Sequence, residues 1–112
     1  MREKLSIPDE HLRAYVQEHY ALSAVTLDFL PLGNDVSAWV YRVLSESGTL
    51  YFLKAKHGPL YEASCLVPRY LKDQGVESVV APLPTKHNEL WTQLGELVVI
   101  LYPFIEGERW RI

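Results

Sequence analysis

The most informative stretch of the sequence is Tyr51-Phe52-Leu53-Lys54-Ala55-Lys56. Because side chains alternate between the two sides of a strand, this stretch is expected to be apolar on both faces of a sheet. Lys54 shares its face with Phe52, and a lysine in the middle of a sheet is costly to bury unless an anion pairs with it. Strand position alone leaves a second interpretation open, in which Lys54 lies near the strand end and its amino group reaches water.

The elements around this stretch follow from hydrophobic periodicity and turn residues. Two helices are predicted, one from Ser6-Ile7-Pro8-Asp9 to about Tyr20 and one from Gly58-Pro59 to about Gln74, with Pro68 inside its apolar stripe. Strands are predicted at residues 25–30, 38–45, 49–56, 76–81, 89–94 and 97–102. Short connections between neighbouring strands favour an antiparallel sheet of about five strands. The predicted class is therefore α+β, with an N-terminal helix and one main helix after the third strand.

Length and composition indicate a single globular domain. The chain has 112 residues, of which 48% are hydrophobic and 22% charged, and these values exclude disordered, collagen-like and coiled-coil proteins. The net charge of −3, without a Lys/Arg cluster, argues against nucleic-acid binding. A single cysteine, Cys65, excludes a disulfide framework and a cysteine-based zinc site. The longest apolar run, at 97–105, is too short to span a membrane, so a cytoplasmic protein without a membrane partner is expected.

Five segments carry a resemblance to a known family. They are Tyr41-Arg42-Val43, Gly48-Thr49-Leu50-Tyr51-Phe52-Leu53-Lys54, Pro68-Arg69-Tyr70-Leu71, Ala81-Pro82-Leu83-Pro84-Thr85 and Leu101-Tyr102-Pro103-Phe104-Ile105-Glu106-Gly107. Their order and spacing resemble the N-terminal lobe of aminoglycoside-phosphotransferase-like kinases, close to the spectinomycin-phosphotransferase type, over nearly the whole chain. The resemblance implies a protein-kinase-like fold, transfer of the γ-phosphoryl group to a hydroxyl, and a connection with antibiotic resistance. It implies ATP with Mg²⁺ as the cofactor of the full-length enzyme, and only weak nucleotide binding is expected of this chain by itself.

The resemblance also implies roles for individual residues. Lys54 would contact the α- and β-phosphates, and Glu62 on the next helix would pair with it. The alternative for Glu62 is a solvated helix carboxylate. Pairing with Lys54 requires the helix to begin almost directly after the strand, because the two positions are only eight residues apart. The turn at 33–37 would cover the phosphates, and the backbone at 102–105 would form the hinge that reads the adenine edge. The predicted nucleotide-binding residues are Gly33, Asn34, Asp35, Ser37, Phe52, Lys54, Glu62, Tyr102, Phe104 and Ile105.

The catalytic residues of the family have no counterpart in these 112 residues. Family members carry an H-x-D-x-x-x-x-N loop, whose aspartate accepts the proton of the acceptor hydroxyl. The residues two positions after the four histidines are Arg13, Ala21, Pro59 and Glu89. We therefore expect residues 1–112 to be a nucleotide-binding lobe without its C-terminal catalytic lobe, to contain no catalytic or metal-binding residue, and to be inactive alone. The alternative is a non-catalytic binding or assembly module that forms a homodimer through an exposed sheet face.

Overall fold

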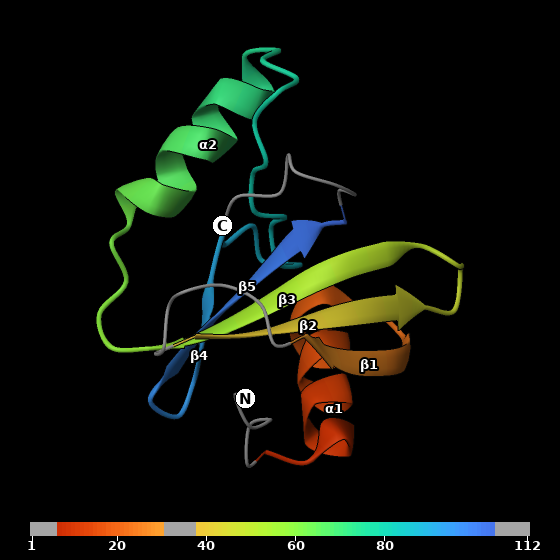
Figure 1. Cartoon of the computed structure of the whole chain (residues 1–112). Helices are drawn as coiled ribbons and strands as arrows, with labels where there is room; N and C mark the ends of the chain where they lie inside the picture. The colour runs from red at the N-terminus through yellow and green to blue at the C-terminus, as the bar shows by residue number, and fades with distance from the viewer. Residues whose placement is uncertain (1–6, 31–37, 105–112) are drawn as a thin grey trace.

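The computed structural model describes residues 7–30 and 38–104 of the chain. Within these ranges an open antiparallel sheet has five strands in the order β1-β2-β3-β5-β4. The elements are α1 (Asp9–Tyr20), β1 (Ala24–Leu30), β2 (Ala38–Ser45), β3 (Leu50–His57), α2 (Ala63–Asp73), β4 (Thr92–Leu94) and β5 (Leu97–Pro103). The two helices lie on opposite sides of the sheet (Figure 1). The predicted α+β class and five-stranded antiparallel sheet are confirmed.

The central strand, β3, pairs with β2 on one side and with β5 on the other. In this register Lys54 lies opposite Val40 of β2 and Ile100 of β5. The β2–β3 turn requires Gly48, which has φ of 86° and donates its amide to the carbonyl of Ser45 at 3.0 Å. Glycine adopts this left-handed conformation without steric cost. The turn therefore holds the register that puts Lys54 in the middle of the sheet.

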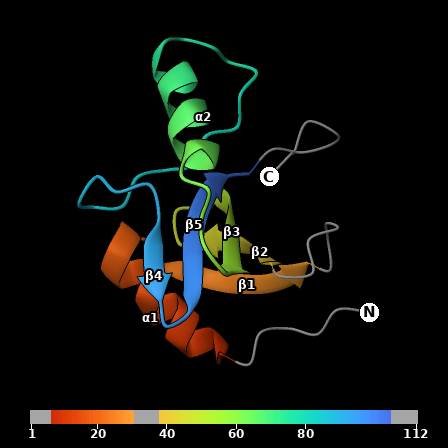
Figure 2. The same cartoon turned by 90° about the vertical axis from the view of Figure 1, so that its left-hand side faces the viewer.

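Helix α1 covers one face of the sheet (Figure 2). Leu12 and Val16 of α1 are fully buried and belong to one core cluster with Tyr41, Leu53 and Val99 of the sheet. Each buried side chain of this kind contributes about 1.5–3 kcal/mol to stability. This cluster is the larger core, and it supports β3 from the side opposite to Lys54.

The bounds of α1 agree with the prediction. The helix begins after Pro8 and ends at Tyr20, where Ala21 follows in the left-handed conformation with φ of 53°. Such a residue commonly terminates a helix. The predicted serine cap, Ser6, lies outside the described residues.

The opposite face of the sheet carries a second, smaller core. Val40, Phe52, Ile100 and Tyr102 are buried there together with Cys65 of α2. Cys65 is the one fully buried residue of α2, all of whose residues are described. The helix is therefore attached to the sheet through a narrow contact, and neither helix in the described ranges is long and apolar enough to cross a membrane.

The start of α2 differs from the prediction. The helix begins at Ala63, not near Gly58, and it continues through Pro68 as one element. Gly58 has φ of 85°, so the chain turns at the end of β3 instead of entering a helix. The residues between this turn and α2 form the connection that crosses the second face of the sheet.

Two predicted strands also differ. Residues 76–81 form no strand, because the amide of Val76 donates to the carbonyl of Leu71 at 3.0 Å and so completes the end of α2. The strand predicted at 89–94 is limited to β4, of three residues. The segment between α2 and β4 is instead held by single hydrogen bonds, including one from the amide of Leu83 to the carbonyl of Leu101 at 2.7 Å.

Candidate functional site

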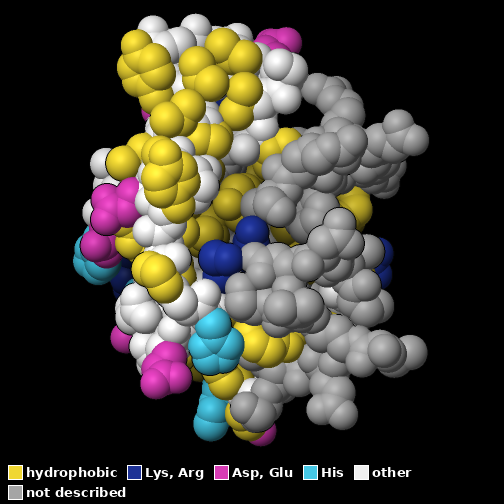
Figure 3. All heavy atoms as spheres, turned by 60° about the vertical axis from the view of Figure 1, so that its left-hand side comes forward, with side chains coloured by type: hydrophobic (Ala, Val, Ile, Leu, Met, Phe, Trp, Pro, Cys, Tyr) yellow, Lys and Arg dark blue, Asp and Glu magenta, His cyan; other side chains and the backbone are white. Residues whose placement is uncertain are grey.

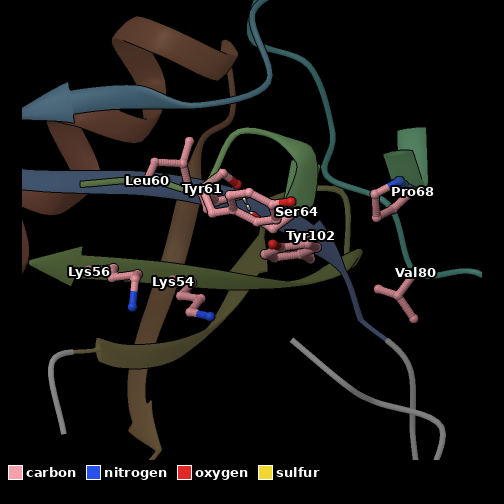
Figure 4. Close-up of a pocket in the computed structure, with 9 residues that line it drawn as sticks. Lys54, Lys56, Leu60, Tyr61, Ser64, Pro68, Val80 and Tyr102 are labelled. Atoms are coloured by element: carbon pink, nitrogen blue, oxygen red, sulfur yellow. Dashed lines mark hydrogen bonds between the residues drawn. The ribbon is translucent and has the colours of Figure 1, made fainter. Parts of the chain in front are cut away.

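A cavity of ≈ 350 Å³ lies between the second face of the sheet and α2. Its lining residues are Lys54, Lys56, Leu60, Tyr61, Ser64, Pro68, Val80, Ile100 and Tyr102. Its volume falls within the range of small-molecule sites, about 300–1,000 Å³. Figure 4 shows that the walls come from β3, from β5 and from the first part of α2 with its preceding connection.

The cationic part of the cavity is built by β3. Lys54 and Lys56 are two residues apart, so they extend to the same side of the strand, as Figure 4 shows. Their cross-strand neighbours on β5 are Ile100 and Val98, which are buried and apolar. Two ammonium groups beside an apolar floor favour an anionic ligand, because charge interactions weaken less there than in water. Figure 3 shows neighbouring basic side chains in a hollow of this side of the molecule.

The aromatic part of the site lies at the other end of the same face. Tyr102 lines the cavity and lies opposite Phe52 in the sheet register. The rings of Phe52 and Phe104 stack with their centroids 4.7 Å apart. Phe52 and Phe104 do not line the cavity themselves, so they support Tyr102 from the adjoining core. Burial raises the pKa of Tyr102 above its ordinary value, which keeps its hydroxyl neutral.

The face that α2 turns towards Lys54 contains Cys65. Burial raises the pKa of the Cys65 thiol, while a hydrogen bond with Ser64 and the nearby charge of Lys54 act in the opposite direction. Glu62 comes just before α2 and is exposed, and no ion pair between described residues joins it to Lys54. The pairing of Lys54 with Glu62 therefore stays a prediction, and Ser64 is the α2 residue before Pro68 that lines the cavity together with Lys54.

Part of the predicted site lies outside the described residues. These positions are Gly33, Asn34, Asp35, Ser37 and Ile105. The strand ends that flank residues 31–37 are described, and they lie at the lysine end of the cavity face. Ala38 is opposite Lys56, while Leu30 is opposite Val40, which is itself opposite Lys54. The role predicted for residues 33–37 remains a prediction.

Three polar cavity residues were not among those predicted for the site: Lys56, Tyr61 and Ser64. Lys56 had a signal in the sequence, because it is two residues from Lys54 on a predicted strand. Tyr61 and Ser64 had none, because their positions depend on how the chain crosses from β3 to α2. The hydroxyl of Ser64 donates to the carbonyl of Tyr61 at 2.6 Å, which closes the first turn before α2.

No acidic, histidine or cysteine side chain is among the described residues that line this cavity. Among the described residues, no group of three or more of them could hold a metal ion. The donors found here are instead ammonium groups and hydroxyls. This set of donors is suited to binding an anion directly.

Comparisons with known proteins identify a similar solved structure. No protein-family model matches the chain, and no match was found among curated proteins. The crystal structure of spectinomycin phosphotransferase APH(9)-Ia in complex with ADP and spectinomycin is 32% identical, with a TM-score of 0.82 over 93% of this chain and 31% of that chain. The AMP-bound complex of the same enzyme is 30% identical, with a TM-score of 0.71 over 86% of this chain and 28% of that chain.

The chain thus spans about a third of the length of the enzyme that it matches. The match extends across 93% of this chain, and it is a match in sequence as well as in shape. The resemblance predicted from the sequence is confirmed: the chain is similar to part of an aminoglycoside phosphotransferase and has an α+β fold like that of a kinase N-terminal lobe.

Proposed function

We propose that this chain is the ATP-binding N-terminal lobe of a small-molecule phosphotransferase. The observation that carries the proposal is a cavity with Lys54 on its floor and Tyr102 at its edge, in a fold similar to an enzyme solved with ADP and with AMP. The complete protein would transfer the γ-phosphoryl group of ATP to a hydroxyl of a small acceptor. This activity extends beyond the third of the relative that the chain spans, so it belongs to the proposal.

In the proposed complex the phosphates lie at Lys54. A half-buried ammonium group on a sheet floor binds phosphate oxygens through charge-assisted hydrogen bonds, which are about twice as strong as neutral ones. The adenine base lies towards Tyr102 and the chain that follows it, where Phe52 and Phe104 provide an aromatic support. The backbone at 102–105 then reads the edge of the base.

The remaining predicted residues complete this proposal. Gly33, Asn34, Asp35 and Ser37 would cover the phosphates, which is supported by the position of their flanking strand ends beside the lysines. Glu62 would pair with Lys54 after a small rotation of α2. This is supported by its spacing from Cys65, since residues three apart lie on the same side of a helix.

The groups that activate the acceptor and hold Mg²⁺ are proposed to lie in a second lobe. The described residues bring together no set of metal ligands, and the 112-residue sequence contains no H-x-D-x-x-x-x-N motif. Lys54 would position the phosphates and stabilise the charge that develops on them. We expect the chain alone to show no phosphotransferase activity.

A nucleotide titration followed by NMR tests the proposed binding. Adding ATP to the 112-residue chain is expected to shift the amide signals of Lys54, Lys56 and Tyr102. Replacing Lys54 with Met removes a hydrogen bond to a charged group, worth about 1.5–3 kcal/mol, and should weaken binding at least about tenfold.

Lys86→Met is the matched control for this titration. Lys86 is exposed, and its amide donates to the carbonyl of His19 in α1, on the other face of the sheet. This variant should bind ATP like the unmodified chain. Equal affinities of the Lys54→Met and Lys86→Met variants would refute the proposed site.

An assembly role is the second candidate, and one observation favours it. Four hydrophobic residues of α2 or the turn before it are exposed: Tyr61 (77%), Leu66 (49%), Val67 (52%) and Tyr70 (63%). Hydrophobic side chains gather on this part of the surface in Figure 3. A homodimer would use this helix surface more readily than the sheet face, which α2 and its flanking segments partly cover. Sedimentation at high concentration should show a dimer that Leu66→Glu disrupts, and a monomer throughout would exclude this role.

A further inference from the structure

The cavity contains a second lysine that the proposed role of Lys54 does not explain. Lys56 is half-buried and lines the same cavity. Its cross-strand neighbours are Ala38 on β2 and Val98 on β5, both buried and apolar. The sheet therefore holds the Lys56 side chain in the same cavity as Lys54, two residues farther along β3.

The position of Lys56 along β3 gives it a different reach from Lys54. Phe52, Lys54 and Lys56 follow one another on one face of the strand, at intervals of about 7 Å. The aromatic end of the face lies at Phe52, which is opposite Tyr102, and Lys56 is the farthest of the three from that end. A ligand with its ring at the aromatic end and its phosphates along β3 would pass Lys54 first and Lys56 second.

We propose that Lys56 binds the phosphates farthest from the base of a nucleoside di- or triphosphate, while Lys54 binds the nearer ones. The inference rests on the proposed function of the cavity and adds to it a preference among nucleotides according to their number of phosphates. A second ammonium group increases the affinity for a ligand that carries further phosphates, and it has little to bind in a monophosphate. The cavity would thus prefer ATP and ADP to AMP because of one residue on β3.

Dissociation constants for ATP, ADP and AMP, measured by NMR titration of the 112-residue chain, test this inference. In the Lys56→Met variant the affinity for ATP is expected to fall about tenfold, while the affinity for AMP changes less than about twofold. Lys56→Arg keeps the positive charge and should retain the preference for ATP. Lys86→Met should leave all three constants unchanged.

The same measurements separate failure of this inference from failure of the proposed function. If Lys56→Met weakens the binding of the three nucleotides equally, or weakens the binding of none of them, the proposed selectivity is refuted. The proposed function is still supported in that case if Lys54→Met weakens nucleotide binding. If no nucleotide shifts the cavity signals of the unmodified chain, both are refuted. Well-dispersed amide signals of β3 in each variant establish that it is folded.

Discussion

Tyr15 joins α1 to the edge of the sheet through its hydroxyl group. It donates to the carbonyl of Gln93 at 2.8 Å and also contacts the hydroxyl of the buried residue Thr92. Losing a partner for a buried polar group costs about 1–3 kcal/mol. We expect Tyr15→Phe to lower the free energy of unfolding by about 1–2 kcal/mol in urea denaturation. Tyr70→Phe, at an exposed position, is the control, and equal effects of the two substitutions would contradict this assignment.

Buried tyrosine hydroxyls and a buried thiol make the free energy of unfolding depend on pH in the alkaline range. Burial raises the pKa of four such groups, which belong to Tyr15, Tyr20, Cys65 and Tyr102. Their ordinary pKa values are 9.0 for the thiol and 10.0 for the phenols, so the folded chain keeps these protons to higher pH than the unfolded chain. The stabilisation is fully present below pH 9.0 and decreases as the pH rises above it.

The expected result is a free energy of unfolding that falls between about pH 9 and pH 11. Urea denaturation at several pH values measures it. Tyr102→Phe removes one of the titrating groups and should make the decrease shallower, whereas the exposed substitution Tyr70→Phe should not. A stability that is constant or rises over this range would contradict the burial of these groups.

A cavity residue could be predicted where the local sequence pattern, such as the alternation of side chains along a strand, determines its position. Lys54 and Tyr102 were predicted, since strand alternation and the family resemblance place both, and the two line one cavity. Tyr61 and Ser64 were missed because the chain crosses the sheet before α2 begins, and no local pattern specifies that path. Glu62 is exposed just before α2, and its pairing with Lys54 stays a prediction.

At the scale of elements, α2 is the least firmly attached part of the described fold. Besides the buried Cys65, Arg69 holds it in place, because its guanidinium donates to the carbonyl of Pro82 at 3.1 Å. Two further hydrogen bonds, at 3.1 and 2.8 Å, join the guanidinium to the carboxylate of Asp73 in the same helix and orient it. We expect Arg69→Gln to increase amide hydrogen exchange in α2 several-fold, with little change in β3. Arg13→Gln, at an exposed position of α1, is the control. Unchanged exchange in α2 would show that Arg69 does not anchor the helix.

Element prediction succeeded where periodicity and turn residues agreed. The hairpin of β2 and β3 was predicted to within one residue, because Gly48 marks its turn between a run rich in Trp, Val and Tyr and a run that contains Tyr51 and Phe52. The strand predicted at 76–81 was wrong. The amide of Val76, the first residue of this apolar run, donates to a carbonyl at the end of α2, and the sequence pattern gives no sign of that hydrogen bond. The strand predicted at 89–94 was too long, since only part of it pairs with β5.

At the scale of the whole molecule, stability depends on the core between α1 and the sheet. Leu53 is fully buried in that core, whereas Leu66 on α2 is 49% exposed. Leu53→Ala should lower the free energy of unfolding by about 2–5 kcal/mol, through lost burial and the cavity left behind. Leu66→Ala should lower it by about 0.5 kcal/mol or less. Thermal denaturation compares the two, and similar losses would contradict the unequal roles of the two sides of the sheet.

In the proposed complex, one cavity binds a nucleotide with its base near Tyr102 and its phosphates along β3. ATP loaded with paramagnetic Mn²⁺ tests this most directly, because the metal binds to the phosphates and broadens nearby amide signals. Mn²⁺ without ATP is the control for direct binding of the metal to the protein. We expect the strongest ATP-dependent broadening at Lys54 and Lys56, with less at Phe104. Strongest broadening at Phe104, or equal broadening throughout the chain, would contradict it.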